Sequence, residues 1–89
     1  MYSILPYTKR QAKRIGVTVK PSSNPKKKLD VFEDGNKVAS IGDINYSDYA
    51  HYLVGNGKTF ADERRKLYHL RHKKAKKGTA GYYASALLW

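Results

Sequence analysis

The sequence predicts one small α+β domain spanning residues 1–89. In this domain a central antiparallel β-hairpin, about 28–33 and 37–42, packs against a long basic helix, about 60–76, with short flanking helices. Three observations predict it. An Asp-Gly pair separates two β-prone runs, a capped and periodic segment follows, and 89 residues with 12% aromatic side chains can form one modest core. No linker is long enough to divide the chain.

The first elements are short. Thr8 is a favourable N-cap for a helix over residues 9–15, and Gly16 is expected to end that helix. Residues 17–19, Val-Thr-Val, are β-prone and predict a short strand. A loop rich in proline and serine follows over residues 21–25.

The hairpin is the clearest local signal. Residues 29–33 and 37–41 are rich in β-branched and apolar side chains, and Asp34-Gly35-Asn36 lies between them. Asp-Gly favours the positive φ angles of a two-residue turn, with or without a small bulge. Gly42-Asp43 should end the second strand.

Two helices are expected after the hairpin. Ser47 can cap a short helix over residues 48–54, which the Gly-Asn-Gly segment at 55–57 should end. Thr59 with Asp62 and Glu63 resembles a capping box, which would begin the long helix at Phe60. Lysines fill its last turn and Gly78 should end it.

The C-terminal segment carries no charge. Thr79 can cap a final helix over residues 80–88, which ends in Leu87-Leu88-Trp89. We expect this aromatic and aliphatic segment to fold back and close the core.

The charge is strongly positive and unevenly distributed. The net charge is +11, with eight Lys or Arg and no acid in residues 1–28, and the same count in residues 64–89. All seven acids lie between these two blocks. Such segregation predicts a counter-charged partner, because a compact domain is otherwise destabilised by self-repulsion.

Helical geometry projects the second block as a stripe. Phe60, Ala61, Leu67, Tyr68, Leu70 and Ala75 fall on one face of the long helix, which should pack on the hairpin. Basic side chains and Asp62 fall on the opposite face. That face is either an ordinary solvated surface or a polyanion-binding surface; the scarcity of interleaved acids and the presence of arginines favour the second.

The tyrosines allow two interpretations. Tyrosines among basic residues can stack on unpaired bases. The three-residue spacing of Tyr46, Tyr49 and Tyr52 is more typical of a packed helical face, and Tyr82-Tyr83 lie in the closing segment. We expect core or rim positions, which favours duplex over single-stranded nucleic acid.

Catalysis and metal binding find little support. The chain has no cysteine, and His69 and His72 lack further ligands nearby, so no zinc site is expected. The segment 55–59 ends in Gly-Lys-Thr but lacks the first glycine of a phosphate loop. Asp62 and Glu63 already have a capping role, which argues against a nuclease. We therefore expect no enzyme activity, no cofactor and no small-molecule substrate.

No membrane segment or secretory signal is expected. No apolar run approaches the roughly 20 residues of a membrane helix, and the N-terminal apolar residues precede the charges, opposite to a secretory signal. We expect an intracellular protein, or one packaged in a particle assembled inside the cell.

Several segments together resemble a known family. They are residues 16–22, 27–32, 34–43 and 46–49, then Asp-Glu-Arg-Arg at 62–65 with residues 68 and 71–73, and residues 81–89. From residue 8 onward the chain is similar to small basic proteins of uncharacterised function from large nucleocytoplasmic DNA viruses of algae and protists. The resemblance implies a viral source and either a DNA-associated or a capsid role, and it assigns no catalytic residue.

The leading hypothesis is therefore a non-enzymatic protein that binds double-stranded DNA through phosphates, with little sequence preference, in viral genome packaging or organisation. The alternative is a minor capsid protein whose basic blocks dock on acidic capsid or core proteins. The candidate contact residues are Lys9, Arg10, Lys13, Arg14, Lys26, Lys27, Lys28, Arg65, Lys66, His69, His72, Lys73 and Lys76.

Overall fold

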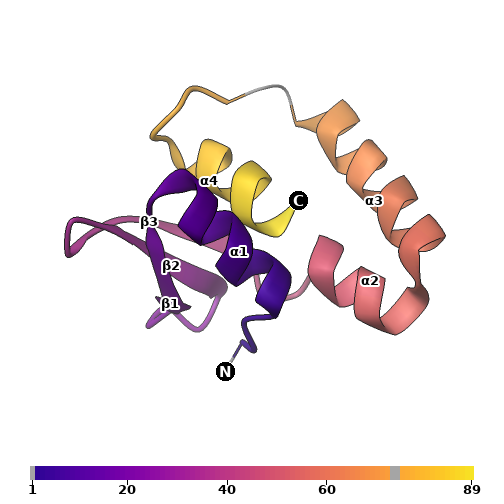
Figure 1. Ribbon diagram of the computed structural model, residues 1–89, viewed down its shortest axis with the longest axis horizontal. Helices are drawn as coiled ribbons and strands as arrows, with labels where there is room; N and C mark the ends of the chain where they lie inside the picture. The colour runs from indigo at the N-terminus through magenta and orange to yellow at the C-terminus, as the bar shows by residue number, and fades with distance from the viewer. Residues whose placement is uncertain (1, 73–74) are drawn as a thin grey trace.

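The computed structural model describes residues 2–72 and 75–89 and has the expected α+β class. Four helices accompany one three-stranded sheet in the described residues (Figure 1). In chain order the elements are α1 (Pro6–Ile15), β1 (Thr18–Pro21), β2 (Lys27–Glu33), β3 (Asn36–Asp43), α2 (Tyr49–Asn56), α3 (Lys58–Arg71) and α4 (Ala80–Leu88).

The sheet is antiparallel in the order β1-β2-β3. Asp34 and Gly35, with φ of 53° and 80°, form the two-residue turn between the paired Glu33 and Asn36. These angles are those of the hairpin turn that Asp-Gly favours. The hairpin prediction is confirmed, with an irregularity in the register between Val31 and Phe32.

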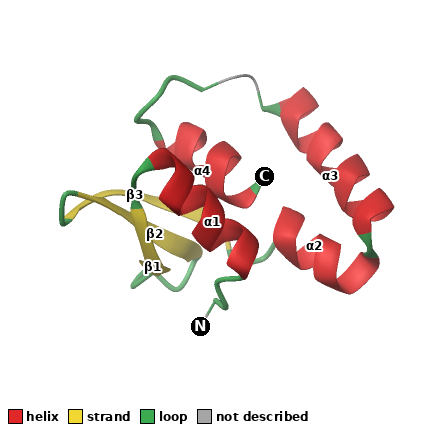
Figure 2. Ribbon diagram, viewed as in Figure 1, coloured by secondary structure: helices red, strands yellow, loops and turns green. Residues whose placement is uncertain are grey.

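The core lies between one face of the sheet and two helices. Leu29, Val31 and Ile41 of the hairpin cluster with Leu87 and Leu88 of α4, and each is at most 2% exposed. Ala12 of α1 joins the same cluster. In Figure 2, α1 and α4 lie side by side over the strands. The C-terminal segment thus closes the core, as expected.

The long helix does not cover the sheet, which corrects the predicted packing. α3 packs mainly on α2, where the rings of Phe60 and Tyr52 lie 5.4 Å apart. On its predicted apolar face Ala61 is buried, but Leu67 and Leu70 are 47% and 70% exposed. The physical reason is competition: α4 carries no charge and offers two leucines and a tyrosine to the sheet, so it buries more apolar surface there than α3 could.

Two predicted helix N-caps are wrong, Thr8 for α1 and Ser47 for α2. α1 begins at Pro6, since proline suits the first helical position. Thr8 is instead fully buried within the helix, and its hydroxyl donates to the Leu87 carbonyl at 3.1 Å. α2 is capped by Asp48 rather than Ser47, because the Asp48 carboxylate accepts from the His51 amide.

α3 also begins and ends differently from its prediction. It starts at Lys58 without a side-chain cap, and Asp62 pairs with Lys58 at 2.7 Å instead of forming a capping box with Thr59. It ends at Arg71; Ala75 and Lys76 are not helical, and residues 73–74 lie outside the described part. The backbone of His72 is extended, with φ of −110° and ψ of 105°, so the helix does not continue through this residue. α4 itself matches its prediction, including the Thr79 cap.

Candidate nucleic-acid interface

The outer face of α1 is an exposed group of four cations. Lys9, Arg10, Lys13 and Arg14 are all exposed, and their spacing of one and four residues places them on one side of the helix. Thr8 and Ala12 on the other side are buried against α4. Among the described residues none of the four cations has an acidic partner within salt-bridge distance. We call these four residues the α1 basic face.

α1 runs antiparallel to α4. Thr8 bonds to Leu87 at the end of α4, and the Gln11 amide lies 3.3 Å from the Ala86 carbonyl. The C-terminal turn of α1, with Lys13 and Arg14, therefore lies toward the beginning of α4 (Figure 1). Lys76 is exposed in the segment that leads into α4, so this end of the molecule gathers cations from both basic blocks.

The three lysines at 26–28 differ in their exposure. Lys26 and Lys27 are exposed at the start of β2 and remain available to a partner. Lys28 is buried, and its ammonium pairs with the fully buried Asp48 carboxylate at 3.1 Å. An internal ion pair of this kind neutralises the charge. The expectation that Lys28 contacts a polyanion is therefore wrong.

The predicted stripe on α3 is interrupted. The Arg65 guanidinium lies 4.0 Å from the centroid of the Tyr49 ring and 3.5 Å from Asp62, so it faces α2. Lys66, His69 and His72 are exposed, and the His72 ring also stacks on Tyr68. The predicted contact Lys73 lies outside the described residues. The structure thus brings only part of the stripe to an open surface.

Three rings form a stack where α3 meets α4. The Trp89 and Tyr68 ring centroids are 4.7 Å apart with an interplanar angle of 8°, and His72 lies on Tyr68 at 4.3 Å and 25°. Burial raises the pKa of the Tyr68 hydroxyl above its usual value. We call Trp89, Tyr68 and His72 the aromatic stack.

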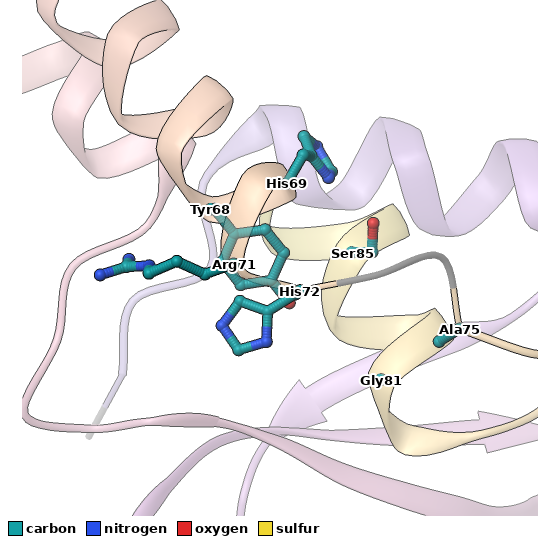
Figure 3. A pocket seen from close by; sticks show the side chains of 7 residues that line it. All are labelled: Tyr68, His69, Arg71, His72, Ala75, Gly81 and Ser85. Carbon is teal, nitrogen blue, oxygen red and sulfur yellow. The ribbon is translucent and has the colours of Figure 1, made fainter.

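Two hollows adjoin the aromatic stack and share Tyr68, Arg71 and His72 in their lining. The smaller, about 470 Å³, lies between the end of α3 and α4 and is also lined by Gly81 and Ser85. Figure 3 shows the Tyr68 and His72 rings facing each other there, with the Arg71 side chain extending away from Ser85.

The larger hollow, about 680 Å³, has all three residues of the aromatic stack in its lining. Its wall combines aromatic side chains with arginines: Tyr46, Tyr52, Arg64, Tyr68, Arg71 and Trp89 are among its lining residues. We call it the aromatic pocket. Arg64 lies over Phe60 at 5.2 Å and over Tyr52 at 5.9 Å, so its guanidinium is held against flat rings.

Arg64 and Arg71 were not predicted as contact residues, because only the opposite face of α3 was expected at the interface. No signal in the sequence singled them out, because both fall within the arc of α3 that was expected to be apolar. Tyr46 was expected in the core or at its rim, yet it is 71% exposed. Arg64 and Arg71 come from α3 and Tyr46 from the segment between β3 and α2, and all three line the aromatic pocket.

No group of three potential metal ligands occurs in residues 2–72 and 75–89. Within the same residues no helix is both long and apolar enough to cross a bilayer. Scans against models of protein families, curated proteins and solved structures give no match to this chain.

Proposed function

We propose that this protein binds nucleic acid without catalysis, chiefly duplex DNA through its phosphates. The observation that carries the proposal is the α1 basic face, four exposed cations without acidic partners in the described residues. Exposed lysines and arginines of this kind neutralise phosphates and release counterions. The proposed contacts are to phosphates, which carry no sequence information, so binding should be sequence-tolerant.

The distribution of acids strengthens the proposal. Asp30 and Asp48 are only 4% and 0% exposed and pair with Lys37 and Lys28. Asp62 pairs with Lys58 and Arg65. Three of the acids are thus engaged internally or with neighbouring cations, which leaves the α1 basic face uncompensated toward a partner.

The test is duplex affinity measured over a range of salt concentrations. Six neutralised phosphates would give a log–log slope of about −5. The double variant Lys13→Gln/Arg14→Gln should reduce the magnitude of that slope by about 2, because two phosphate contacts are lost. Fluorescence anisotropy of a labelled duplex provides the measurement.

A matched control removes the same charge elsewhere. Lys37 and Lys58 already pair with Asp30 and Asp62, so Lys37→Gln/Lys58→Gln should leave the slope within experimental scatter of wild type. A flat salt response, or equal effects of the two double variants, would contradict the proposal.

The second candidate is a virion structural role in which this chain docks on an acidic capsid or core protein. The observation that favours it is the exposure of Leu67 and Leu70 on α3 close to exposed Lys66, a mixture of apolar and basic groups suited to a protein partner. This role would be supported if the protein does not bind duplex DNA at low salt but co-sediments with capsid proteins after nuclease treatment.

A further inference from the structure

We infer that the aromatic pocket binds a single unpaired nucleotide, its base among the rings and its phosphate on Arg64 and Arg71. The inference rests on the proposed function and deepens it, because it adds a site for an unpaired nucleotide to a surface for duplex phosphates. The ligand class is a planar heteroaromatic base joined to a phosphate, either free or within a single strand.

The size of the pocket suits this ligand. Its volume of about 680 Å³ lies within the usual range of roughly 300–1,000 Å³ for small-molecule sites. The pocket is formed by segments far apart in the chain: the end of β3, α2, α3 and the end of α4 each contribute.

The rings supply an apolar, flat surface that is left partly open. Tyr46 is 71% exposed although it is a large aromatic residue, and Tyr52, Tyr68 and Trp89 are only partly buried. The Trp89 ring lies parallel to Tyr68 and tilted by 47° to Tyr52. Bases stack on aromatic side chains of this kind with little dependence on sequence.

The charges of the pocket favour a phosphate. Arg64 and Arg71 line it, and neither pairs with an acid in the described part of the chain. Arginine binds phosphate oxygens through two parallel hydrogen bonds. Lys28 also lines the pocket, but its charge is matched by Asp48. The positive charge that the pocket presents to a ligand therefore comes from Arg64 and Arg71.

One acid lies at the same site and fits the base rather than the phosphate. Asp43 lines the pocket, and one of its oxygens accepts from the Asn45 amide at 2.9 Å. Its carboxylate can accept a hydrogen bond from an exocyclic amino group of a base. The combination of rings, two arginines and one acceptor corresponds to a nucleotide more closely than to a bare anion.

The position of Trp89 makes a direct test possible. Trp89 is the only tryptophan of the chain and lines the pocket, so its fluorescence reports on occupancy. Titration with adenosine monophosphate should change that fluorescence and saturate. Adenosine without phosphate, ribose 5-phosphate without base, and inorganic phosphate should each bind at least about tenfold more weakly, because each lacks one half of the recognition.

Variants in the pocket test phosphate recognition and base stacking separately. Arg64→Gln/Arg71→Gln should weaken adenosine monophosphate binding by about tenfold or more, since both phosphate contacts are lost. Tyr46→Ala should weaken it while Tyr46→Phe retains it, because the ring and not the hydroxyl stacks on the base. All three positions are exposed, and circular dichroism melts establish whether the variants remain folded.

A control on α1 keeps this inference distinct from the proposed function. No α1 residue lines the pocket, so Lys13→Gln/Arg14→Gln should lose duplex affinity and keep the affinity for adenosine monophosphate. A short single-stranded oligonucleotide should compete with adenosine monophosphate if the pocket serves a strand.

The possible failures are separable. Absence of a saturable change with adenosine monophosphate, or an equal response to inorganic phosphate, overturns the pocket inference even if duplex binding follows the α1 basic face. Saturable binding of adenosine monophosphate without duplex or oligonucleotide binding supports the pocket as a free-nucleotide site and overturns the proposed function.

Discussion

Asp48 joins the N-terminal segment, β2 and α2 through one buried carboxylate. It accepts from the Tyr2 hydroxyl at 2.5 Å, the Lys28 ammonium at 3.1 Å and the His51 amide at 3.1 Å. Although burial opposes its charge, the hydrogen bonds from Tyr2 and His51 and the charge of Lys28 hold the pKa of Asp48 below its usual value. The residue is therefore an anion at neutral pH and a structural centre.

Asp48→Asn should destabilise the domain by about 3 kcal/mol or more, because it leaves the buried Lys28 ammonium without a counter-charge. Urea denaturation followed by circular dichroism measures the change. Glu63→Gln removes the same charge from an exposed position on α3 and should cost no more than about 0.5 kcal/mol. Equal losses of unfolding free energy in the two variants would contradict the role of Asp48 as the buried counter-charge of Lys28.

At the scale of the elements, the contrast between α3 and α4 decides the architecture. α4 has buried Tyr83, Leu87 and Leu88 and lies on the sheet, whereas only Ala61 of α3 is buried. Gly42 allows the close approach, because a Cβ at this position would lie 2.8 Å from the Leu88 side chain and 3.0 Å from Lys28. The end of β3 is thus fitted to α4 by the absence of a side chain.

Gly42→Ala and Gly35→Ala form a matched pair. Both glycines have φ of about +80°, but a Cβ at Gly35 meets nothing within 4 Å. Gly35→Ala should therefore cost about 1 kcal/mol, the penalty of the left-handed backbone alone. Gly42→Ala should cost about 1–3 kcal/mol more, because Leu88 and Lys28 must move. Thermal melts of the two variants compare them, and equal melting temperatures would contradict this account.

At the scale of the whole molecule, folding buries some of the acids and leaves the α1 basic face exposed. Asp30 lies inside a group formed by Ser22, Ser40 and Lys37, with hydrogen bonds of 2.6 and 2.7 Å from the two serines. Those hydrogen bonds lower the pKa of Asp30 from 3.8 to about 2. The most buried acids thus stabilise the fold, while the α1 basic face remains outside.

The pH dependence of stability follows from these carboxyls. A carboxyl whose pKa is lower in the folded chain stabilises the fold above its unfolded pKa, and this contribution is lost as the pH falls toward the folded value. Melting temperatures should therefore be level from pH 7 to about 5 and fall steadily from about 4 to 2. The melting temperature of Asp30→Asn should be lower than that of wild type at neutral pH and should fall less steeply between about pH 4 and 2. A variant curve parallel to wild type would contradict the role of Asp30.

Local patterns in the sequence determined much of the fold. The Asp34-Gly35 turn, the Gly16 end of α1 and the Thr79 cap of α4 depend on backbone preferences of a few adjacent residues, so they could be predicted from the chain. The exposed positions of Lys9, Arg10, Lys13 and Arg14 follow from helical periodicity in the same way.

Contacts between distant segments decided the rest. Which helix covers the sheet depends on competition for the same apolar surface, and periodicity within α3 carries no information about α4. The burial of Lys28 depends on Asp48, twenty residues away. The aromatic pocket requires Arg64 and Arg71 of α3 to meet Trp89 and Tyr46, which no local spacing relates. The sequence by itself determined the elements and the basic character of the surface; only tertiary packing decided which cations face outward and where the rings enclose a hollow, because burial is a property of the assembled core.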